Sequence, residues 1–336
     1  MSRRVFVTGA AGFVGVNLVR GLAEAGWHVV ATARREPDAL TRAFLESVTE
    51  RIVWSIGDAT DAPWLQAQVR DHAPDAIVHA AAVTPTAEVE RAATRSIVDT
   101  NLVATLTVLD SARASGVGRV LYASSTGIYA AAPRYRPRRE DELLPPHNLY
   151  ALCKLASEGL VTEYARIHGM RAASVRIGSV YGPMERPTNS RSGMSLVATL
   201  VEAAQARHAV RVSHVDVSRD LIHAADVVAA VAALLDAPEL RWPVYNVASA
   251  ESYPVRRVLE HVAELAGLRW SSSPVDEADL AMTPGHHRDA VDLSRLTADT
   301  GFSPRVGLAA GLAHTLAWRQ ISTDLGEVAT FSGAPL

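Results

Sequence analysis

The segment Thr8-Gly9-Ala10-Ala11-Gly12-Phe13-Val14-Gly15 decides the fold, because its Gly-x-x-Gly-x-x-Gly spacing stands between a β-branched run and an apolar helical pattern. The first glycine permits a sharp turn, the second lets the backbone approach a diphosphate, and the third lets the helix pack on the strand. The amide end of the helix then faces the anion. The segment therefore predicts a dinucleotide-binding loop, with a plain strand-to-helix turn as the alternative. The residues expected at the cofactor are Gly9, Gly12, Phe13, Val14 and Gly15.

Outside this loop, short β-branched runs alternate with helical periodicity through about residue 180, which predicts an α/β fold with a Rossmann-type, doubly wound parallel sheet. The expected strands are Arg4 to Thr8, His28 to Thr32, Arg51 to Ser55, Ala76 to Ala80, Arg119 to Ser124 and Ala172 to Ile177. The expected helices are Phe13 to Ala25, Ala62 to Asp71, Ile97 to Ser115 and Leu149 to His168. Beyond Gly182 the pattern changes to mixed helices and strands. We therefore expect an NAD(P)-binding domain at residues 1–180 and a smaller mixed α/β substrate lobe at residues 181–330.

The composition excludes several classes of partner. Among the 336 residues, 36 acidic side chains against 33 lysines and arginines give a formal net charge of -3, too weak a field to attract nucleic acid or an anionic membrane. The single cysteine, Cys153, excludes an intramolecular disulfide and favours a cytoplasmic location. The apolar run Val227 to Leu235 is much shorter than the roughly 20 residues that span a membrane. His286 and His287 have no partners at metal-ligand spacing, so no metal site is expected.

The end of the second strand distinguishes NAD from NADP, because the adenosine ribose arrives there. The sequence reads Ala31-Thr32-Ala33-Arg34-Arg35, which offers no carboxylate for a ribose 2'-hydroxyl and two guanidinium groups suited to a 2'-phosphate. This pattern favours NADP over NAD. The alternative is that Arg34 and Arg35 begin a solvated helix and pair with Glu36 or Asp38. Asp58, just after the third strand, is expected near the adenine ring or as a simple turn residue.

Tyr150 and Lys154 are the candidate catalytic residues. They stand four apart on a predicted helix and therefore share one face. A free tyrosine has a pKa of about 10, and a neighbouring ammonium and an oxidised nicotinamide both favour the phenolate. We therefore expect Tyr150 to act as a base whose pKa Lys154 lowers. The strand that ends at Ser124-Ser125-Thr126 supports this site, because the carboxyl end of a parallel strand points into the ligand crevice.

With these residues together, the chain resembles the extended short-chain dehydrogenase/reductase family, the NAD-dependent epimerase/dehydratase type. The matching pieces are Thr8 to Gly15, His79-Ala80-Ala81-Ala82, Asn101 in Thr100-Asn101-Leu102, Ser124 to Tyr129, Tyr150 to Lys154, Tyr181-Gly182-Pro183 and Arg219 to His223. The resemblance implies that Ala80, Ala81 and Asn101 border the cofactor, with Tyr150 and Lys154. It makes Ser125 the hydroxyl that positions the substrate oxygen.

The resemblance also implies that the chain passes back and forth between the two lobes and that two copies of it form a dimer. Segments near residues 213–248 are expected to return from the substrate lobe to the nucleotide domain. A homodimer is expected through the helices Ile97 to Ser115 and Leu149 to His168. Arg219 matches an arginine that contacts the substrate diphosphate in sugar epimerases, although pairing with Asp216 or Asp220 is the alternative. Thr126 and Ser179 complete the expected substrate site.

Several positions depart from the family pattern. Ala130 follows Tyr129 in place of a glycine, and Cys153 precedes the lysine in place of a serine. Ser179 stands where many nucleotide-sugar enzymes carry asparagine, which weakens the epimerase interpretation. The string Arg176 to Ser179 instead resembles one in uronate dehydrogenases. The basic segment Arg134 to Arg139, followed by three acidic residues, favours a self-neutralising surface loop.

Three functions follow from these patterns. The first is an NAD(P)-dependent oxidoreductase that acts on a hydroxyl carbon of a sugar or sugar acid. The second is a nucleotide-sugar epimerase or dehydratase with tightly bound NAD. The third is a nucleotide-sensing regulator without catalysis, against which the presence of Ser125, Tyr150 and Lys154 argues.

Overall fold

The computed structural model describes residues 3–129, 137–142, 145–188, 190–191, 193–283 and 287–324. Ala130, the residues Arg134 to Arg136 of the basic segment, and His286 lie outside the described residues. Within the described helices, none is both long enough and apolar enough to cross a lipid bilayer.

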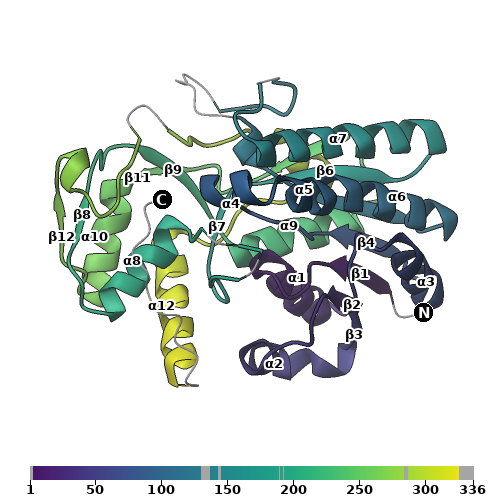
Figure 1. Ribbon diagram of the computed structural model, residues 1–336, viewed down its shortest axis with the longest axis horizontal. Helices are drawn as coiled ribbons and strands as arrows, with labels where there is room; N and C mark the ends of the chain where they lie inside the picture. The colour runs from purple at the N-terminus through teal and green to yellow at the C-terminus, as the bar shows by residue number, and fades with distance from the viewer. Residues whose placement is uncertain are drawn as a thin grey trace.

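A seven-stranded sheet in the order β10-β6-β5-β4-β1-β2-β3 forms the larger part of the molecule (Figure 1). Every neighbouring pair in it is parallel. The strands are β1 (Arg4–Thr8), β2 (His28–Ala33), β3 (Ile52–Ile56), β4 (Ala76–His79), β5 (Arg119–Ser125), β6 (Ala172–Ile177) and β10 (Val244–Val247). From β1 the chain adds β2 and β3 on one side, and then returns to add β4 and the later strands on the other side. This change between β1 and β4 is the switch point of a Rossmann-type fold, which confirms the predicted fold class.

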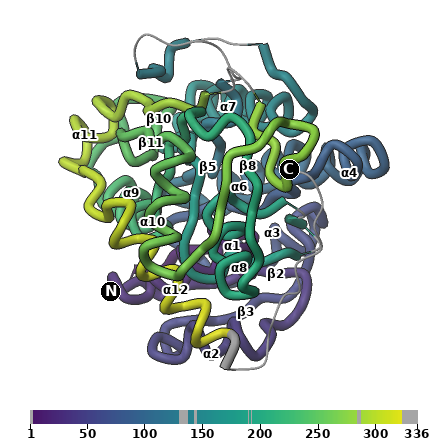
Figure 2. The backbone as a smooth tube through the Cα atoms, turned by 90° about the vertical axis from the view of Figure 1, so that its left-hand side faces the viewer, coloured from purple at the N-terminus to yellow at the C-terminus, as the bar shows by residue number. Residues whose placement is uncertain are grey.

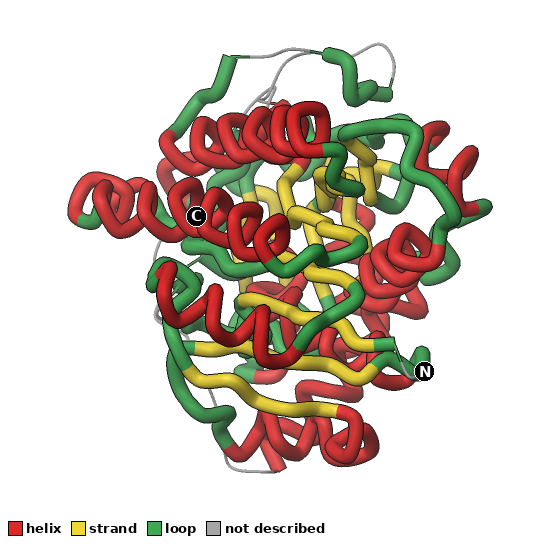
Figure 3. The backbone as a smooth tube through the Cα atoms, turned by 90° about the vertical axis from the view of Figure 1, so that its right-hand side faces the viewer, coloured by secondary structure: helices red, strands yellow, loops and turns green. Residues whose placement is uncertain are grey.

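Helices cover both faces of this sheet, as the red helices flanking the yellow strands in Figure 3 show. One face packs on α3 (Ala62–His72), α6 (Ala104–Ala114) and α7 (Leu149–His168) through a core that includes Leu65, Leu109 and Val161. The other packs on α1 (Phe13–Glu24), α9 (Ala224–Asp236) and α11 (Ser294–Thr300). Because β-branched strands are buried on both faces, they read as continuous apolar runs, which made them recognisable in the sequence.

A smaller group of elements packs beside the sheet, on the left of Figure 1 and facing the viewer in Figure 2. It contains a sheet in the order β11-β9-β7 and a strand pair, β12-β8. These strands are β7 (Ser179–Tyr181), β8 (Val210–Val212), β9 (Ser218–His223), β11 (Ser252–Pro254) and β12 (Trp270–Ser272). The helices α8 (Leu196–Gln205), α10 (Val255–Ala266) and α12 (Leu308–Asp324) enclose a second apolar core with them.

The chain crosses between these two groups more than once. After β9, α9 packs against α1, and β10 then joins the large sheet beside β6 in parallel. Arg119 on β5 donates to the Leu234 and Leu235 carbonyls at the end of α9, at 2.6 and 2.9 Å. The residues after position 181 therefore supply both a helix and a strand to the part of the molecule that surrounds the seven-stranded sheet.

One predicted helix is corrected by the structure. The range Ile97 to Ser115 is divided into α5 (Thr94–Val98), a π-helical turn η2 (Asp99–Val103) and α6. Periodicity alone does not reveal a single wider turn, and such turns occur often at functional sites. The helices α2 (Ala39–Leu45) and α4 (Ala87–Ala92) were not predicted, because both are short.

Candidate active site

The glycine loop requires glycine at two positions for different reasons. Gly9 has a φ of +68°, and a Cβ on it would lie 2.6 Å from the Ala81 backbone at the end of β4. A Cβ on Gly15 would lie 2.0 Å from the Gly9 carbonyl oxygen. Gly12 caps α1 without a side chain, so the amide groups of the first turn are left for an anion. These close approaches bring the ends of β1 and β4 together and form a cradle suited to a diphosphate.

Side chains from β1 and η2 fix the loop that follows β4. The Thr8 hydroxyl accepts from the Ala81 amide at 3.2 Å and lies 2.7 Å from His79 Nδ1. Asn101 accepts from the Val83 amide at 2.7 Å and donates to the Val83 carbonyl at 2.8 Å. The amide of Asn101 is therefore used to hold the loop backbone, and we propose that it serves the cofactor site through this loop.

A cleft of about 680 Å³ lies at the tips of β2 and β3, where an adenosine would be held. It is lined by Arg34, Asp58, Thr60, Arg91, Ala92, Ala93, Thr94, Arg95, Ser96, Asp99 and Thr100. Asp58 accepts from the Thr60 amide and hydroxyl through one oxygen, at 2.9 and 2.8 Å, so it is a turn residue that also borders the cleft. The cradle and this cleft together fit a dinucleotide.

The arginines at the end of β2 do not make the ion pairs that the sequence left as an alternative. Glu36 lies 3.9 Å from Arg42, and Asp38 accepts from Arg186 at 2.5 Å. Arg34 and Arg35 are exposed, and in the described part of the chain no ion pair involves either of them. Only Arg34 lines the cleft, so the structure separates two residues that the sequence treated as equivalent.

The helix α7 carries Tyr150 and Lys154 on its inner face. Asn148 begins the helix by accepting from the Ala151 amide at 2.8 Å. Lys154 is 2% exposed, and its Nζ donates to the Ala123 carbonyl on β5 at 2.7 Å. The same Nζ lies 5.7 Å from the centre of the Tyr150 ring. Burial lowers the pKa of Lys154 to about 8, while the nearby Glu158 carboxylate opposes the shift.

The Tyr150 hydroxyl lies beside Ser125, and two arginines from other segments act on its pKa. Burial raises the pKa of Tyr150, whereas a hydrogen bond with Ser125 and the positive charges of Arg191 and Arg288 lower it. The Ser125 hydroxyl also accepts from the Gly127 amide at 3.0 Å, which fixes its position at the end of β5. The protein residues alone therefore keep the pKa of Tyr150 raised, and the two arginines were not recognised in the sequence.

The adjacent serine, Ser124, turns the other way. Its hydroxyl donates to Glu158 at 2.5 Å, and Glu158 forms a buried ion pair with Arg176 at 2.8 Å. Arg176 also donates to the Tyr129 hydroxyl at 2.7 Å, and Tyr129 donates to Asn246 at 2.8 Å. Arg176, part of the string that resembled uronate dehydrogenases, is thus a buried structural residue.

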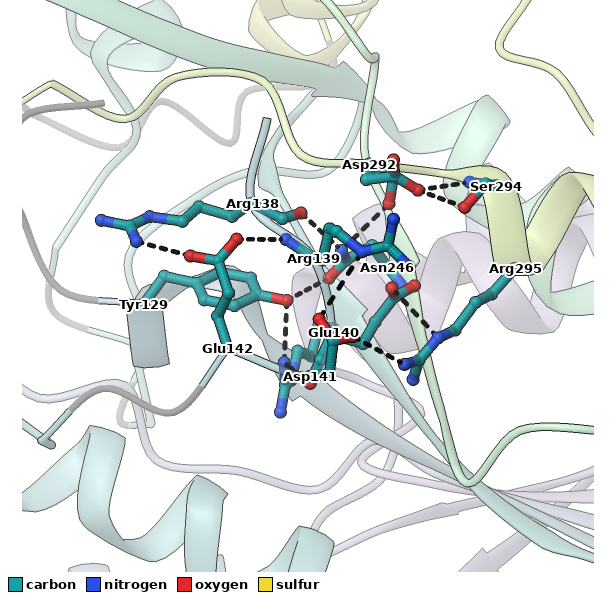
Figure 4. A network of polar contacts seen from close by, with 11 residues as sticks. Tyr129, Arg138, Arg139, Glu140, Asp141, Glu142, Asn246, Asp292, Ser294 and Arg295 are labelled. Atoms are coloured by element: carbon teal, nitrogen blue, oxygen red, sulfur yellow. Dashed lines mark hydrogen bonds and ion pairs between the residues drawn. The ribbon is translucent and has the colours of Figure 1, made fainter. Parts of the chain in front are cut away.

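Figure 4 follows this network outward from Tyr129 and Asn246 to the segment 137–142. The backbone amide of Asn246 donates to one carboxylate oxygen of Glu140 at 2.9 Å, and Arg295 lies 3.5 Å from the other. Arg138 pairs with Glu142 at 2.6 Å. The described end of the basic segment is therefore joined to acidic neighbours, as its composition suggested.

The expected substrate residues come from three separate elements. Thr126 begins the short helix η3 (Thr126–Tyr129), and Ser179 begins β7; both are half-buried. Arg219 on β9 donates to the Ser218 carbonyl at 2.9 Å, while Asp216 pairs with Arg256. Arg219 forms a β-bridge with Arg288, and burial together with the Arg288 charge lowers the pKa of Arg219 to about 10. His287 accepts from the Ser218 amide at 3.1 Å, which is a structural role.

Comparison with known proteins identifies relatives over nearly the whole chain. The sequence model of the "NAD dependent epimerase/dehydratase family" matches residues 5–248. A GDP-6-deoxy-D-mannose reductase of Pseudomonas aeruginosa is 30% identical over 331 residues, covering 94% of this chain and 97% of its own. A UDP-glucose 4-epimerase of Thermus thermophilus, solved with NAD, is 27% identical with a TM-score of 0.79 and covers 94% of this chain and 99% of that one. MoeE5, solved with UDP-glucuronic acid and NAD, is 27% identical with a TM-score of 0.78, covering 95% and 99%.

Proposed function

Because the chain belongs to the NAD-dependent epimerase/dehydratase family of extended short-chain dehydrogenases/reductases, we propose that it is an NAD(P)-dependent oxidoreductase acting on a hydroxyl carbon of a sugar or sugar acid. The observation that carries this proposal is the convergence of Ser125, Tyr150 and Lys154 where β5 meets α7. Their elements, β5 and α7, are joined by the bond from Lys154 to Ala123. The chain is an enzyme of this type, which argues against a nucleotide-sensing regulator without catalysis.

Each residue has a distinct part in the proposed chemistry. Tyr150 takes the proton of the substrate hydroxyl during oxidation and returns it during reduction. Ser125 donates to the same substrate oxygen and holds it against Tyr150. Lys154 remains largely protonated near neutral pH, and an ammonium has three donors, of which the Ala123 carbonyl uses one. The others can hold a ribose hydroxyl. The nicotinamide ring, when bound, supplies the acceptor or donor of the hydride.

An epimerase or dehydratase is the second candidate, and some of the relatives support it. A UDP-glucose 4-epimerase and a dTDP-glucose 4,6-dehydratase are among the proteins similar to this chain. Such an enzyme returns the hydride to its substrate, so net turnover consumes no cofactor. Following the near-ultraviolet absorbance of the reduced cofactor during turnover separates the two: a steady change supports the oxidoreductase, and product without any change supports the epimerase or dehydratase.

For the cofactor we propose NADP rather than NAD, although the solved neighbours carry NAD. Support comes from Arg34, which lines the adenosine cleft without an acidic partner at the tip of β2. Charge-assisted hydrogen bonds to a 2'-phosphate contribute about 1.5 to 3 kcal/mol, roughly a tenfold to hundredfold preference. Dissociation constants of both cofactors, measured for wild type and for Arg34→Ala, test this. An NAD preference in the wild type would overturn it, and Arg35→Ala is the matched control.

We also propose a homodimer through η2, α6 and α7. Four apolar side chains on these elements are exposed: Val103 at 42%, Leu106 at 38%, Leu152 at 50% and Ile167 at 60%. Exposed apolar side chains on neighbouring helices are the kind of surface that a dimer interface would bury. Light scattering gives the mass in solution, and a monomer would contradict this proposal without affecting the chemistry.

A further inference from the structure

The segment between β7 and α8 holds one guanidinium group in a fixed position near Tyr150. The Thr84 amide donates to the Ser190 carbonyl at 2.7 Å, and Thr84 forms a β-bridge with Arg191. The Arg191 Nη2 donates to Glu185 at 2.6 Å, and its Cζ lies 5.4 Å from the centre of the Phe13 ring at the start of α1. Arg191 is therefore placed between the glycine cradle and the loop after β4.

Glu185 is the residue that fixes this arrangement. It is 4% exposed and also accepts from the Ser195 amide and hydroxyl, both at 2.7 Å. A carboxylate held by three donors cannot turn away from Arg191 without losing buried hydrogen bonds. The orientation of the Arg191 guanidinium is thus set before any ligand arrives.

A second guanidinium approaches Tyr150 from the substrate lobe. Arg288 forms a β-bridge with Arg219, and within the described residues its side chain makes no hydrogen bond or ion pair with a carboxylate. The charges of Arg191 and Arg288 both lower the pKa of Tyr150, so both lie within electrostatic reach of the same hydroxyl. Thr84, the neighbour of Arg191, also hydrogen-bonds Tyr150. Besides burial, the Arg288 charge also lowers the pKa of Arg219, so positive charge is concentrated on this side of Tyr150 and would attract an anionic ligand.

We propose that Arg191, with Arg288 as the second cation, binds a carboxylate of the substrate close to the carbon on which Tyr150 acts. The substrate class is then a sugar acid, free or nucleotide-linked, rather than a neutral sugar. The planar guanidinium matches a carboxylate, and the remaining positive charge suits one negative charge because Glu185 already neutralises part of Arg191. This inference rests on the proposed function, since it places the carboxylate by reference to Tyr150.

The test compares ligands that differ only in the carboxylate. Binding of UDP-glucuronate and UDP-glucose, and of D-glucuronate and D-glucose, is measured by calorimetry on the full chain with its cofactor. Within at least one pair we expect the acid to bind about tenfold to hundredfold more tightly. Arg191→Gln should abolish that preference while affinity for the neutral member changes little. Because both members of the first pair carry the same diphosphate, phosphate binding alone produces no difference between them.

Two further variants keep the result interpretable. The double variant with Glu185→Gln and Arg191→Gln removes both charges of the ion pair, so no buried charge is left uncompensated. This double variant should also lose the preference for the acid. Arg186→Gln is the matched control, because that guanidinium donates to Asp38 and Thr41 on the other side of the segment and should leave the preference intact. Equal affinities within both pairs, binding of neither acid, or a preference that survives loss of Arg191 would overturn the proposal. Hydride transfer that depends on Tyr150 but ignores the carboxylate would leave the proposed function standing.

Discussion

Ser124 and Ser125 are neighbours on β5, yet their hydroxyls belong to two regions with opposite chemistry. Behind the strand, Ser124, Glu158 and Arg176 form a buried network in which each charged group has a partner. In front of it, Ser125 and Tyr150 lie among positive charges that the described residues balance only in part. A buried network that is fully paired fixes the backbone, whereas groups with unused donors are the ones a ligand can engage. The difference suggests that stability resides behind β5 and chemistry in front of it.

The strongest test of the buried region removes its central charge. Glu158→Gln leaves the Arg176 guanidinium buried without its carboxylate, which costs about 3 to 5 kcal/mol in the free energy of unfolding. Chemical denaturation measures this loss. Adding Arg176→Met should recover part of it, because no uncompensated charge then remains. A loss below about 1 kcal/mol would mean that the network contributes little to stability.

The corresponding test of the front region is Tyr150→Phe. The change removes the proposed proton acceptor and preserves the ring, so turnover should fall about a hundredfold or more while cofactor affinity stays nearly constant. Steady-state kinetics and cofactor titration report the two quantities. The free energy of unfolding should change little. Activity within a few-fold of wild type would remove Tyr150 from the reaction.

The two serines provide the most direct comparison. Ser125→Ala should reduce turnover about tenfold to a hundredfold, since its hydroxyl is assigned to the substrate oxygen, and should lower stability by about 1 kcal/mol because the Gly127 amide loses its acceptor. Ser124→Ala should lower stability by about 1 kcal/mol and leave turnover nearly unchanged, because its hydroxyl donates only to Glu158. Parallel kinetics and denaturation on both variants are required. If the two exchanged their effects, the division between the regions would be wrong.

The smallest effect concerns His223, a buried histidine at the end of β9 beside the exposed His314. His223 accepts from the Ala225 amide and lies 3.3 Å from His314 on α12; burial, with the His314 charge, lowers the pKa of His223 to about 4. The folded state favours the neutral imidazole of His223. Its contribution to the free energy of unfolding is therefore fully present above the unfolded pKa of about 6.5 and is lost as pH falls toward 4. When pH falls from about 7.5 to 5.5, we expect the free energy of unfolding of His223→Gln to drop by about 1 kcal/mol less than that of wild type. Equal losses in both proteins would assign the acid sensitivity to other groups.

The elements closest to the cofactor were predicted well because their signals are local. The ranges of β1, β6 and α7 match the structure, since buried parallel strands read as apolar runs and Asn148 and Gly169 mark the ends of α7. The glycine cradle was equally readable, because a residue without a Cβ is required at Gly9 and Gly15 whatever the rest of the chain does. The π-helical turn at Asp99–Val103 was missed, because one wider turn leaves the helical pattern almost unchanged.

The sequence by itself thus determined the strands and helices around the parallel sheet, the glycine loop, and the common face of Tyr150 and Lys154, because each of these signals lies within a few neighbouring residues. Tertiary structure alone decided that Ser124 turns toward Glu158 while Ser125 turns toward Tyr150, and that only Arg34 of the two arginines lines the cleft. It also brought Arg191 and Arg288 to Tyr150 from segments far apart in the chain. No local pattern encodes such a meeting, because long-range charge and burial depend on how the two groups of elements pack together.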